Sequence, residues 1–179
     1  MLNKKLLAAM VTGALFCGLT VKMSAKPADG PSDTQIVGIV ISANNLDVEY
    51  AKIALAKSKN KAVREFAQRM VTDHSKVQLS VVALAEKLGV LAEDSPTRES
   101  LKSGGQDVFE KLNSLQGKEF DKYYIDNEVA YHKVVNGAVA TVLIPSAQNP
   151  DLKAALQGVQ GLFLEHGAHA ERVQAATAK

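Results

Sequence analysis

Hydrophobic residues recur at steps of three and four along four long segments of the chain, which is the spacing of one buried face of an α-helix. The four segments are 33–57, 61–88, 118–143 and 150–175. A shorter helix is expected over 106–115, inside a connection that also holds Pro96, Gly104 and Gly105. The pattern predicts an all-α four-helix bundle over residues 33–176, with a short extra helix in the connection between helices two and three.

Residues typical of helix ends stand at the borders of these segments. The candidate N-caps are Ser32 or Asp33, Asn60 and Asn149. Pro150 follows at the first helical position of the last segment, where its missing N–H needs no partner. Gly89 suits the left-handed position after the second segment, and Pro145 is expected to end the third. Local chemistry therefore supports the helix boundaries that the hydrophobic pattern predicts.

The first 25 residues have the pattern of a secretory signal peptide that is cleaved on export. Two lysines at positions 4 and 5 precede an apolar stretch over 6–21, and Ser24 and Ala25 form a small-residue cleavage context. Glycines inside the apolar stretch and a proline after it argue against a stable membrane anchor. We therefore expect a periplasmic protein with a flexible leader over 26–32, and association with the outer membrane stays open.

Removal of residues 1–25 changes the charge of the protein. The full chain has 21 basic and 19 acidic residues; the removed segment holds three lysines and no acid, so 18 basic and 19 acidic residues remain. This balance offers no basic surface for nucleic acid. The only cysteine, Cys17, lies in the removed segment, and the chain has neither a glycine-rich phosphate loop nor a Gly-x-Ser-x-Gly motif. The sequence thus favours a protein without enzymatic activity, and it leaves protein partners and oligomeric state open.

Five ionisable residues interrupt the apolar faces of the four predicted helices. They are Asp47, His74, Glu128, His132 and His166. Counting from the helix ends at about 1.5 Å per residue places all five within about two turns, in the middle of the bundle. Three imidazoles and two carboxylates in one buried layer suit a divalent transition metal. The many imidazoles favour zinc, copper or nickel over iron, and di-iron bundles use Glu-x-x-His motifs that this chain lacks.

The sequence leaves open the roles of the residues next to this layer, and it allows a second interpretation of the layer in which no metal is bound. Asp73 and Glu165 point about 100° away from the adjacent histidines, which suits a supporting position or the surface. His169, one turn beyond His166, is an alternative fourth imidazole, and Tyr131 is placed to donate a hydrogen bond to the layer. The same layer can also be a hydrogen-bonded Asp/Glu–His network that only fixes helix register in a structural or interaction protein of the cell envelope.

The two interpretations predict different responses to pH. A bound metal requires neutral imidazoles, so it is released as the pH falls below the usual histidine pKa of about 6.5. In a metal-free network, the neighbouring carboxylates are expected to raise the histidine pKa values. The folded protein would then be more stable at about pH 5.5 than at about pH 8.

Two stretches of the chain resemble the DUF4142 family of exported bacterial proteins. They are NLDVEYAKIAL, from Asn45 to Leu55, and FAQRMVTDHSK, from Phe66 to Lys76; weaker similarity continues through Phe120, Tyr124, His132 and His166. The resemblance implies a ferritin-like bundle and a periplasmic location. It implies no activity, because the family is defined by its unknown function. Family members usually carry Glu where this chain has Asp47, whose carboxylate is shorter.

Overall fold

The described part of the chain is helical apart from its connections. The structure is a computed structural model that describes residues 30–177. Its helices are α1 (Asp33–Lys57), α2 (Lys61–Leu88), α3 (Pro96–Ser114), α4 (Gly117–Ala138), the π-helix η1 (Val139–Leu143), α5 (Ile144–Ser146) and α6 (Pro150–Thr177). No strand occurs within residues 30–177, which confirms the predicted all-α class. The expected signal peptide at 1–25 and the first part of the leader, 26–29, lie outside the described residues.

Three of the long helices, α1, α2 and α6, begin at the expected capping residues, and α2 ends at the expected glycine. The Ser32 side chain accepts a hydrogen bond from the Gln35 N–H, and the Gln35 side chain accepts one from the Ser32 N–H. Asn60 caps α2 and Asn149 caps α6 through their side-chain oxygens. Gly89 follows α2 with a φ of 64°, and its N–H donates to carbonyls of the last turn. These local contacts determine where α1, α2 and α6 begin, and hence the depth at which their side chains meet the other helices.

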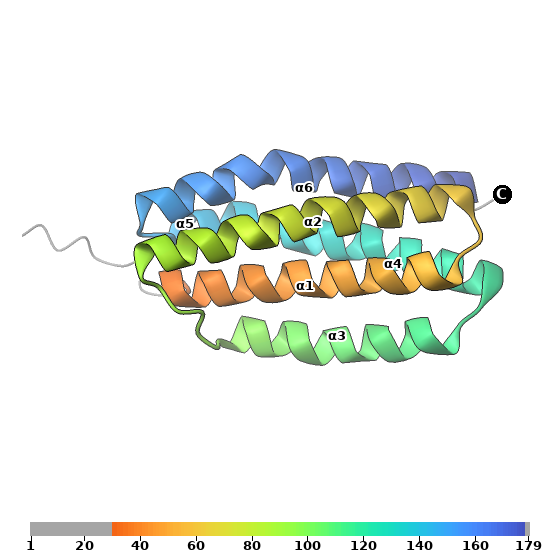
Figure 1. The fold of residues 1–179 in the computed structure, drawn as a ribbon, viewed down its shortest axis with the longest axis horizontal. Coiled ribbons are helices and arrows are strands. Elements are labelled where there is room, and N and C mark those ends of the chain that lie inside the picture. The colour runs from red at the N-terminus through yellow and green to blue at the C-terminus, as the bar shows by residue number, and fades with distance from the viewer. Residues whose placement is uncertain (1–29, 178–179) are drawn as a thin grey trace, which may run out of the picture.

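Four rods run side by side as a bundle: α1, α2, α6 and the continuous rod of α4, η1 and α5 (Figure 1). α1 packs on α2, α4 packs on α6, and contacts of α2 with α6 and of α1 with α4 close the bundle. α3 lies outside the bundle against α1. The Lys57 ammonium at the end of α1 donates to the carbonyls of Leu112 at 2.7 Å and Asn113 at 2.8 Å, which ties the end of α3 to the bundle.

The prediction of a short helix over 106–115 is wrong in length. α3 begins at Pro96 and has 19 residues, with Gly104 and Gly105 inside it. A serine N-cap and a proline in the first turn start this helix earlier than expected. Gly105 is buried against α1, where an added Cβ would lie 2.5 Å from Leu46 Cδ2. The glycine therefore allows α3 to approach α1 closely and does not end the helix.

Replacing Gly105 by Val is expected to destabilise the protein by about 1–3 kcal/mol, because the new side chain overlaps Leu46 and Tyr50 on α1. The matched control is Gly104→Val, since a Cβ at Gly104 meets nothing within 4 Å. The control should change the stability by less than about 0.5 kcal/mol. Urea unfolding of both variants measures the difference. Equal stabilities would show that α3 does not pack on α1 through Gly105.

The prediction that the third long helix ends before Pro145 is wrong. The helix continues from α4 through η1 and α5. In an α-helix, proline removes one backbone donor and its ring collides with the carbonyl one turn earlier. The π stretch changes the pairing just before the proline, because the Ile144 N–H donates to the Val139 carbonyl five residues back. The apolar face moves with this wider turn: Leu143 is buried, whereas Val142, which a regular spacing of three and four after His132 would bury, is 42% exposed.

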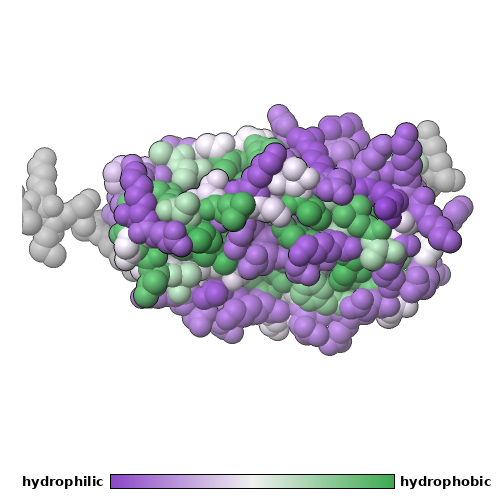
Figure 2. All heavy atoms as spheres, in the orientation of Figure 1, coloured by the Kyte–Doolittle hydropathy of each residue, from purple (hydrophilic) through white to green (hydrophobic). Residues whose placement is uncertain are grey.

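Two apolar clusters fill the bundle, one on each side of a buried polar layer. Ile36, Leu152 and Phe163 belong to one cluster, and Phe66 and Phe120 belong to the other. On the face formed by α1, α2 and α3, hydrophobic side chains lie in separate patches between hydrophilic ones (Figure 2). Within residues 30–177, no helix combines the length and the hydrophobicity that a membrane span needs.

Candidate metal centre

The five predicted ionisable residues lie together in the polar layer between the two apolar clusters. Asp47 comes from α1, His74 from α2, Glu128 and His132 from α4, and His166 from α6. Their exposed fractions are 0% for Asp47, Glu128 and His166, 1% for His132 and 4% for His74. Because burial of an unpaired charge is costly, the stability of this layer depends on what each nitrogen and oxygen contacts.

The His74 ring is held by Asn44. His74 Nδ1 lies 2.8 Å from Asn44 Oδ1, and Asn44 Nδ2 donates to the carbonyl of Val40 at 2.8 Å. Because a carbonyl can only accept, the Asn44 amide turns its oxygen toward the histidine, and His74 Nδ1 must carry the proton. A neutral His74 therefore presents a lone pair at Nε2. Asn44 was not predicted, although its position three residues before Asp47 places it on the same face of α1.

The other two rings are oriented in the same manner. His132 Nδ1 donates to the carbonyl of Glu128 at 3.0 Å, which leaves the lone pair on His132 Nε2. His166 Nε2 donates to Asp73 Oδ2 at 3.0 Å, which leaves the lone pair on His166 Nδ1. Asp73 also accepts a hydrogen bond from Arg69 Nε at 3.3 Å. All three imidazoles thus donate their N–H to an oxygen at the edge of the layer, which determines their tautomers and ring orientations.

The atoms that carry the lone pairs converge. His74 Nε2 lies 3.1 Å from His166 Nδ1 and 3.2 Å from Asp47 Oδ2, and His132 Nε2 lies 3.5 Å from the same Asp47 oxygen. One ligand atom from each of the three histidines lies within 4.8 Å of the other two. In a tetrahedral site with bonds of about 2.0–2.2 Å, ligand atoms are separated by about 3.3–3.6 Å. The three separations of 3.1, 3.2 and 3.5 Å are therefore close to those between ligand atoms of a tetrahedral site, with Asp47 reaching His74 and His132 from beside the three-histidine group.

The layer contains more free acceptors than donors. Both oxygens of Asp47, both oxygens of Glu128 and Nε2 of His132 have no hydrogen-bond partner. Lone pairs that face one another repel unless a proton or a cation lies between them, and buried acceptors without partners are costly. Asp47, Glu128 and His132 also form a second group whose ligand atoms lie within 4.8 Å of one another. Both carboxylates therefore adjoin the three-histidine group: Asp47 Oδ2 faces the Nε2 atoms of His74 and His132, whereas Glu128 faces His132 Nδ1.

Burial moves the pKa of every group in the layer toward the range that favours its neutral form. Desolvation raises the pKa of Asp47 to about 8, and desolvation together with the nearby Asp47 charge raises the pKa of Glu128 well above its ordinary value. Desolvation also lowers the pKa of His132 to about 4, that of His74 well below its usual value, and that of His166 despite its bond to Asp73. The expected rise of the histidine pKa values is therefore wrong, because desolvation outweighs the attraction of the carboxylates.

These shifts predict that the metal-free protein is most stable between about pH 6 and pH 7. Below about pH 6.5 the histidines of the unfolded chain bind protons, whereas those of the folded protein stay neutral because their pKa values are lower. The stability therefore falls with decreasing pH. The folded Asp47 keeps its proton up to about pH 8, whereas the unfolded one loses it near 3.8, so this contribution to stability declines as the pH rises from 3.8 and is lost by about pH 8. Thermal melting at a series of pH values, in the presence of a chelator, measures how the stability depends on pH. A stability that continues to rise down to about pH 5 would restore the original expectation for the histidines.

The other residues considered in the sequence lie outside both ligand groups. The ring of His169 is half-buried and lies 5.1 Å from that of Phe66. Glu165 is 70% exposed and pairs with Arg69 at 3.1 Å. The Tyr131 hydroxyl donates to a backbone carbonyl of α1 at 2.9 Å, so the predicted hydrogen bond from Tyr131 to the histidine layer does not form.

Comparison with known proteins assigns the chain to a family. The family described as "Domain of unknown function (DUF4142)" matches residues 19–173, a range that includes every residue of the candidate centre. No curated protein and no solved structure matched the chain. Because the family match covers most of the sequence and nearly all of the bundle, the chain belongs to the DUF4142 family, whose function is unknown.

Proposed function

We propose that this protein is exported to the periplasm and binds one divalent transition metal ion in its mid-bundle layer. The ligands are His74 Nε2, His132 Nε2, His166 Nδ1 and a carboxylate oxygen of Asp47. The main support for this proposal is the orientation of the three imidazole rings. Each ring N–H donates to an oxygen at the edge of the layer, so three lone pairs and a carboxylate without donors face one another. One cation would satisfy all four groups at once.

The ligand set favours zinc, copper or nickel. Imidazole nitrogens suit these ions, whereas the di-iron centres of helical bundles use two histidines and four glutamates. Ligand separations of 3.1, 3.2 and 3.5 Å fit a tetrahedral ion, and zinc commonly takes this geometry with nitrogen and oxygen ligands. Among the three ions, the geometry therefore supports zinc best.

Asp73 is expected to strengthen metal binding without being a ligand, because its carboxylate holds the His166 ring in place. Replacing Asp73 by Ala should weaken the affinity about 10–100-fold. Glu165→Ala is the matched control, since Glu165 pairs with the same Arg69 but is 70% exposed. Competition with a chromophoric chelator measures both affinities. If the two variants bind equally tightly, Asp73 has no part in orienting the ligand.

A second candidate function is structural, and the raised pKa of Asp47 supports it. A neutral Asp47 carboxyl can donate a hydrogen bond to His74 Nε2, which lies 3.2 Å from Asp47 Oδ2. The layer is then a polar network that fixes the register of the four helices in a non-enzymatic protein of the cell envelope. This function requires no metal, so the metal content of the protein separates it from the first.

Metal analysis of protein prepared from the periplasm without a His-tag tests the proposal. We expect one ion per chain in the parent and none in the double variant His74→Ala, His132→Ala. His169→Ala is the control, because it removes the one histidine that lies outside the ligand groups. A metal content unchanged by the double substitution would reject the proposed ligands. Mass spectrometry of the same sample tests export, since cleavage after Ala25 is expected.

A further inference from the structure

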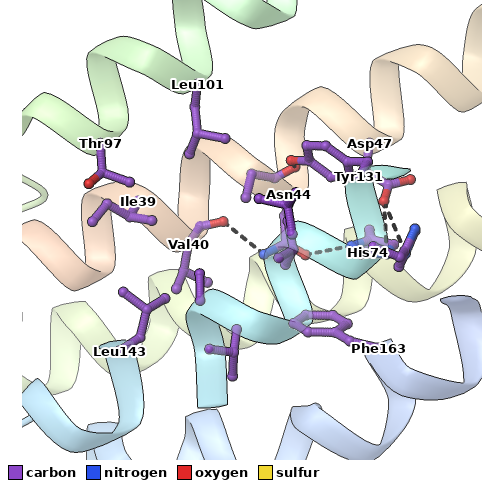
Figure 3. A pocket seen from close by; sticks show the side chains of 16 residues that line it. Ile39, Val40, Asn44, Asp47, His74, Thr97, Leu101, Tyr131, Leu143 and Phe163 are labelled. Carbon is purple, nitrogen blue, oxygen red and sulfur yellow. Dashed lines mark hydrogen bonds and ion pairs between the residues drawn. The ribbon is translucent and has the colours of Figure 1, made fainter. Parts of the chain in front are cut away.

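An apolar cavity of about 100 Å³ lies beside the proposed metal centre. At its inner end it is lined by Asp47, His74 and His132, three of the four proposed ligands. Thr97 on α3 and Val134 on α4 also line it; both are exposed, Val134 by 71%. Figure 3 shows Thr97 at the opposite side of the cavity from Asp47 and His74. The cavity therefore leads from the surface between α3 and α4 to the ligand side chains.

The wall between these two ends is hydrophobic. It is formed mainly by Ile39, Val40, Leu101, Leu143 and Phe163. Asn44 and Tyr131 also line the cavity, but their polar groups already bond to other groups of the protein. Of the lining groups, Asp47 and His132 are at most 1% exposed and have acceptor atoms without a partner. No lysine or arginine lines the cavity, so an anion would meet no counter-charge on the way in.

The π-helix contributes to the shape of this cavity. Val139 and Leu143, the first and last residues of η1, both line it. A π-helical turn is wider than an α-helical turn, and such turns occur frequently beside functional sites. His166 does not line the cavity, so an ion held by the four ligands would meet the cavity on the side away from that ring.

We infer that the cavity admits a small uncharged molecule to the metal centre, an inference that rests on the proposed metal site. The molecule has an apolar body of a few non-hydrogen atoms and one lone-pair donor that reaches the ion. An apolar cavity of about 150 Å³ accepts benzene, so the cavity of about 100 Å³ suits smaller molecules. Sulfur is a donor that zinc and copper both accept, which makes a short alkyl thiol a suitable probe.

Cobalt(II) in place of zinc makes ligand entry visible, because its visible bands report the protein ligands and a near-ultraviolet band reports a cobalt–sulfur bond. When ethanethiol binds, the ion expands from four ligands to five as the Co–S bond forms, and the thiol proton passes to the buffer. We expect ethanethiol to produce the sulfur band. The comparison probe is 2-mercaptoethanesulfonate, which carries the same thiol and a permanent charge, and it should not produce the band. Equal responses to the two thiols would overturn the inference.

Two substitutions fill the cavity from different helices: Ala138→Leu on α4 and Ala43→Leu on α1. Both should keep the visible cobalt bands, which shows that the bundle and the ion are intact, and lose the sulfur band with ethanethiol. Ala154→Leu, at an exposed position of α6 that does not line the cavity, is the control and should respond like the parent. A full sulfur band in both cavity-filling variants would overturn the inference.

Xenon binding, followed by NMR, tests the cavity independently of the metal ion, because xenon enters dry apolar cavities that hold no metal. Metal-free parent protein should shift the xenon resonance, and Ala138→Leu should lose this shift. Absence of cobalt bands in the parent would reject the proposed metal centre and with it the entry of a ligand to the ion. Cobalt bands without any ethanethiol or xenon response would leave the metal centre in place and reject the cavity as its entrance.

Discussion

Adding zinc to the metal-free protein at about pH 8 is expected to raise the free energy of unfolding by about 4 kcal/mol when free zinc is about 1,000 times its dissociation constant. For a chain of this size, each kcal/mol raises the melting temperature by about 2–4 °C, so a gain of about 10 °C follows. The gain should shrink as the pH falls, because zinc requires Asp47 without its proton and the three imidazoles in neutral form.

Circular dichroism during heating, with zinc and with a chelator, measures this gain at several pH values. His166→Ala removes one proposed ligand and should abolish the gain. His169→Ala, whose imidazole lies outside both ligand groups, should show the full gain. An equal zinc response in these two variants would place the ion elsewhere. A parent protein that does not respond to zinc at any pH would favour the register network over the metal site.

Replacing Asp47 by Asn is expected to remove most of the zinc gain of about 4 kcal/mol while leaving the metal-free protein folded. The amide is nearly the same size as a neutral carboxyl, and its NH2 group can donate to His74 Nε2, 3.2 Å from Asp47 Oδ2. The amide also has no proton to lose. The stability advantage of the metal-free variant over the parent should therefore grow as the pH rises from about 4 to about 8, the range in which only the unfolded Asp47 carboxyl ionises, and stay constant above it.

Urea unfolding of Asp47→Asn with and without zinc, at about pH 6.5 and about pH 9, measures both effects. Glu128→Gln is the matched control, because Glu128 is buried in the same layer but its carboxylate lies 3.5 Å from His132 Nδ1, which is not the nitrogen that carries the lone pair. The control should keep most of the zinc gain. A full zinc gain in Asp47→Asn would contradict the proposed oxygen ligand, and a variant that unfolds without zinc would contradict the hydrogen bond to His74.

The sequence by itself determined the helices of the bundle and the depth of its polar layer. Ser32, Asn60 and Gly89 satisfy backbone groups within a few residues of their own position, so their effect can be predicted without the rest of the molecule. The layer was predictable for a related reason. Helical rise is constant, so a residue's distance from the end of its helix places it along the bundle. Asp47 and His132 are both fully buried, as the interrupted apolar faces predict.

Only the tertiary structure decided how the groups of the layer are oriented and charged. The lone pair of His74 depends on Asn44, 30 residues away, and that of His166 depends on Asp73, 93 residues away. The histidine pKa values fall because water is excluded on all sides, a consequence of packing that no local pattern contains. The start of α3 at Ser95 and Pro96 is a local signal that the sequence contains, whereas its continuation through Gly105 depends on the tertiary structure, because a glycine disfavours a helix by itself and here allows close contact with α1.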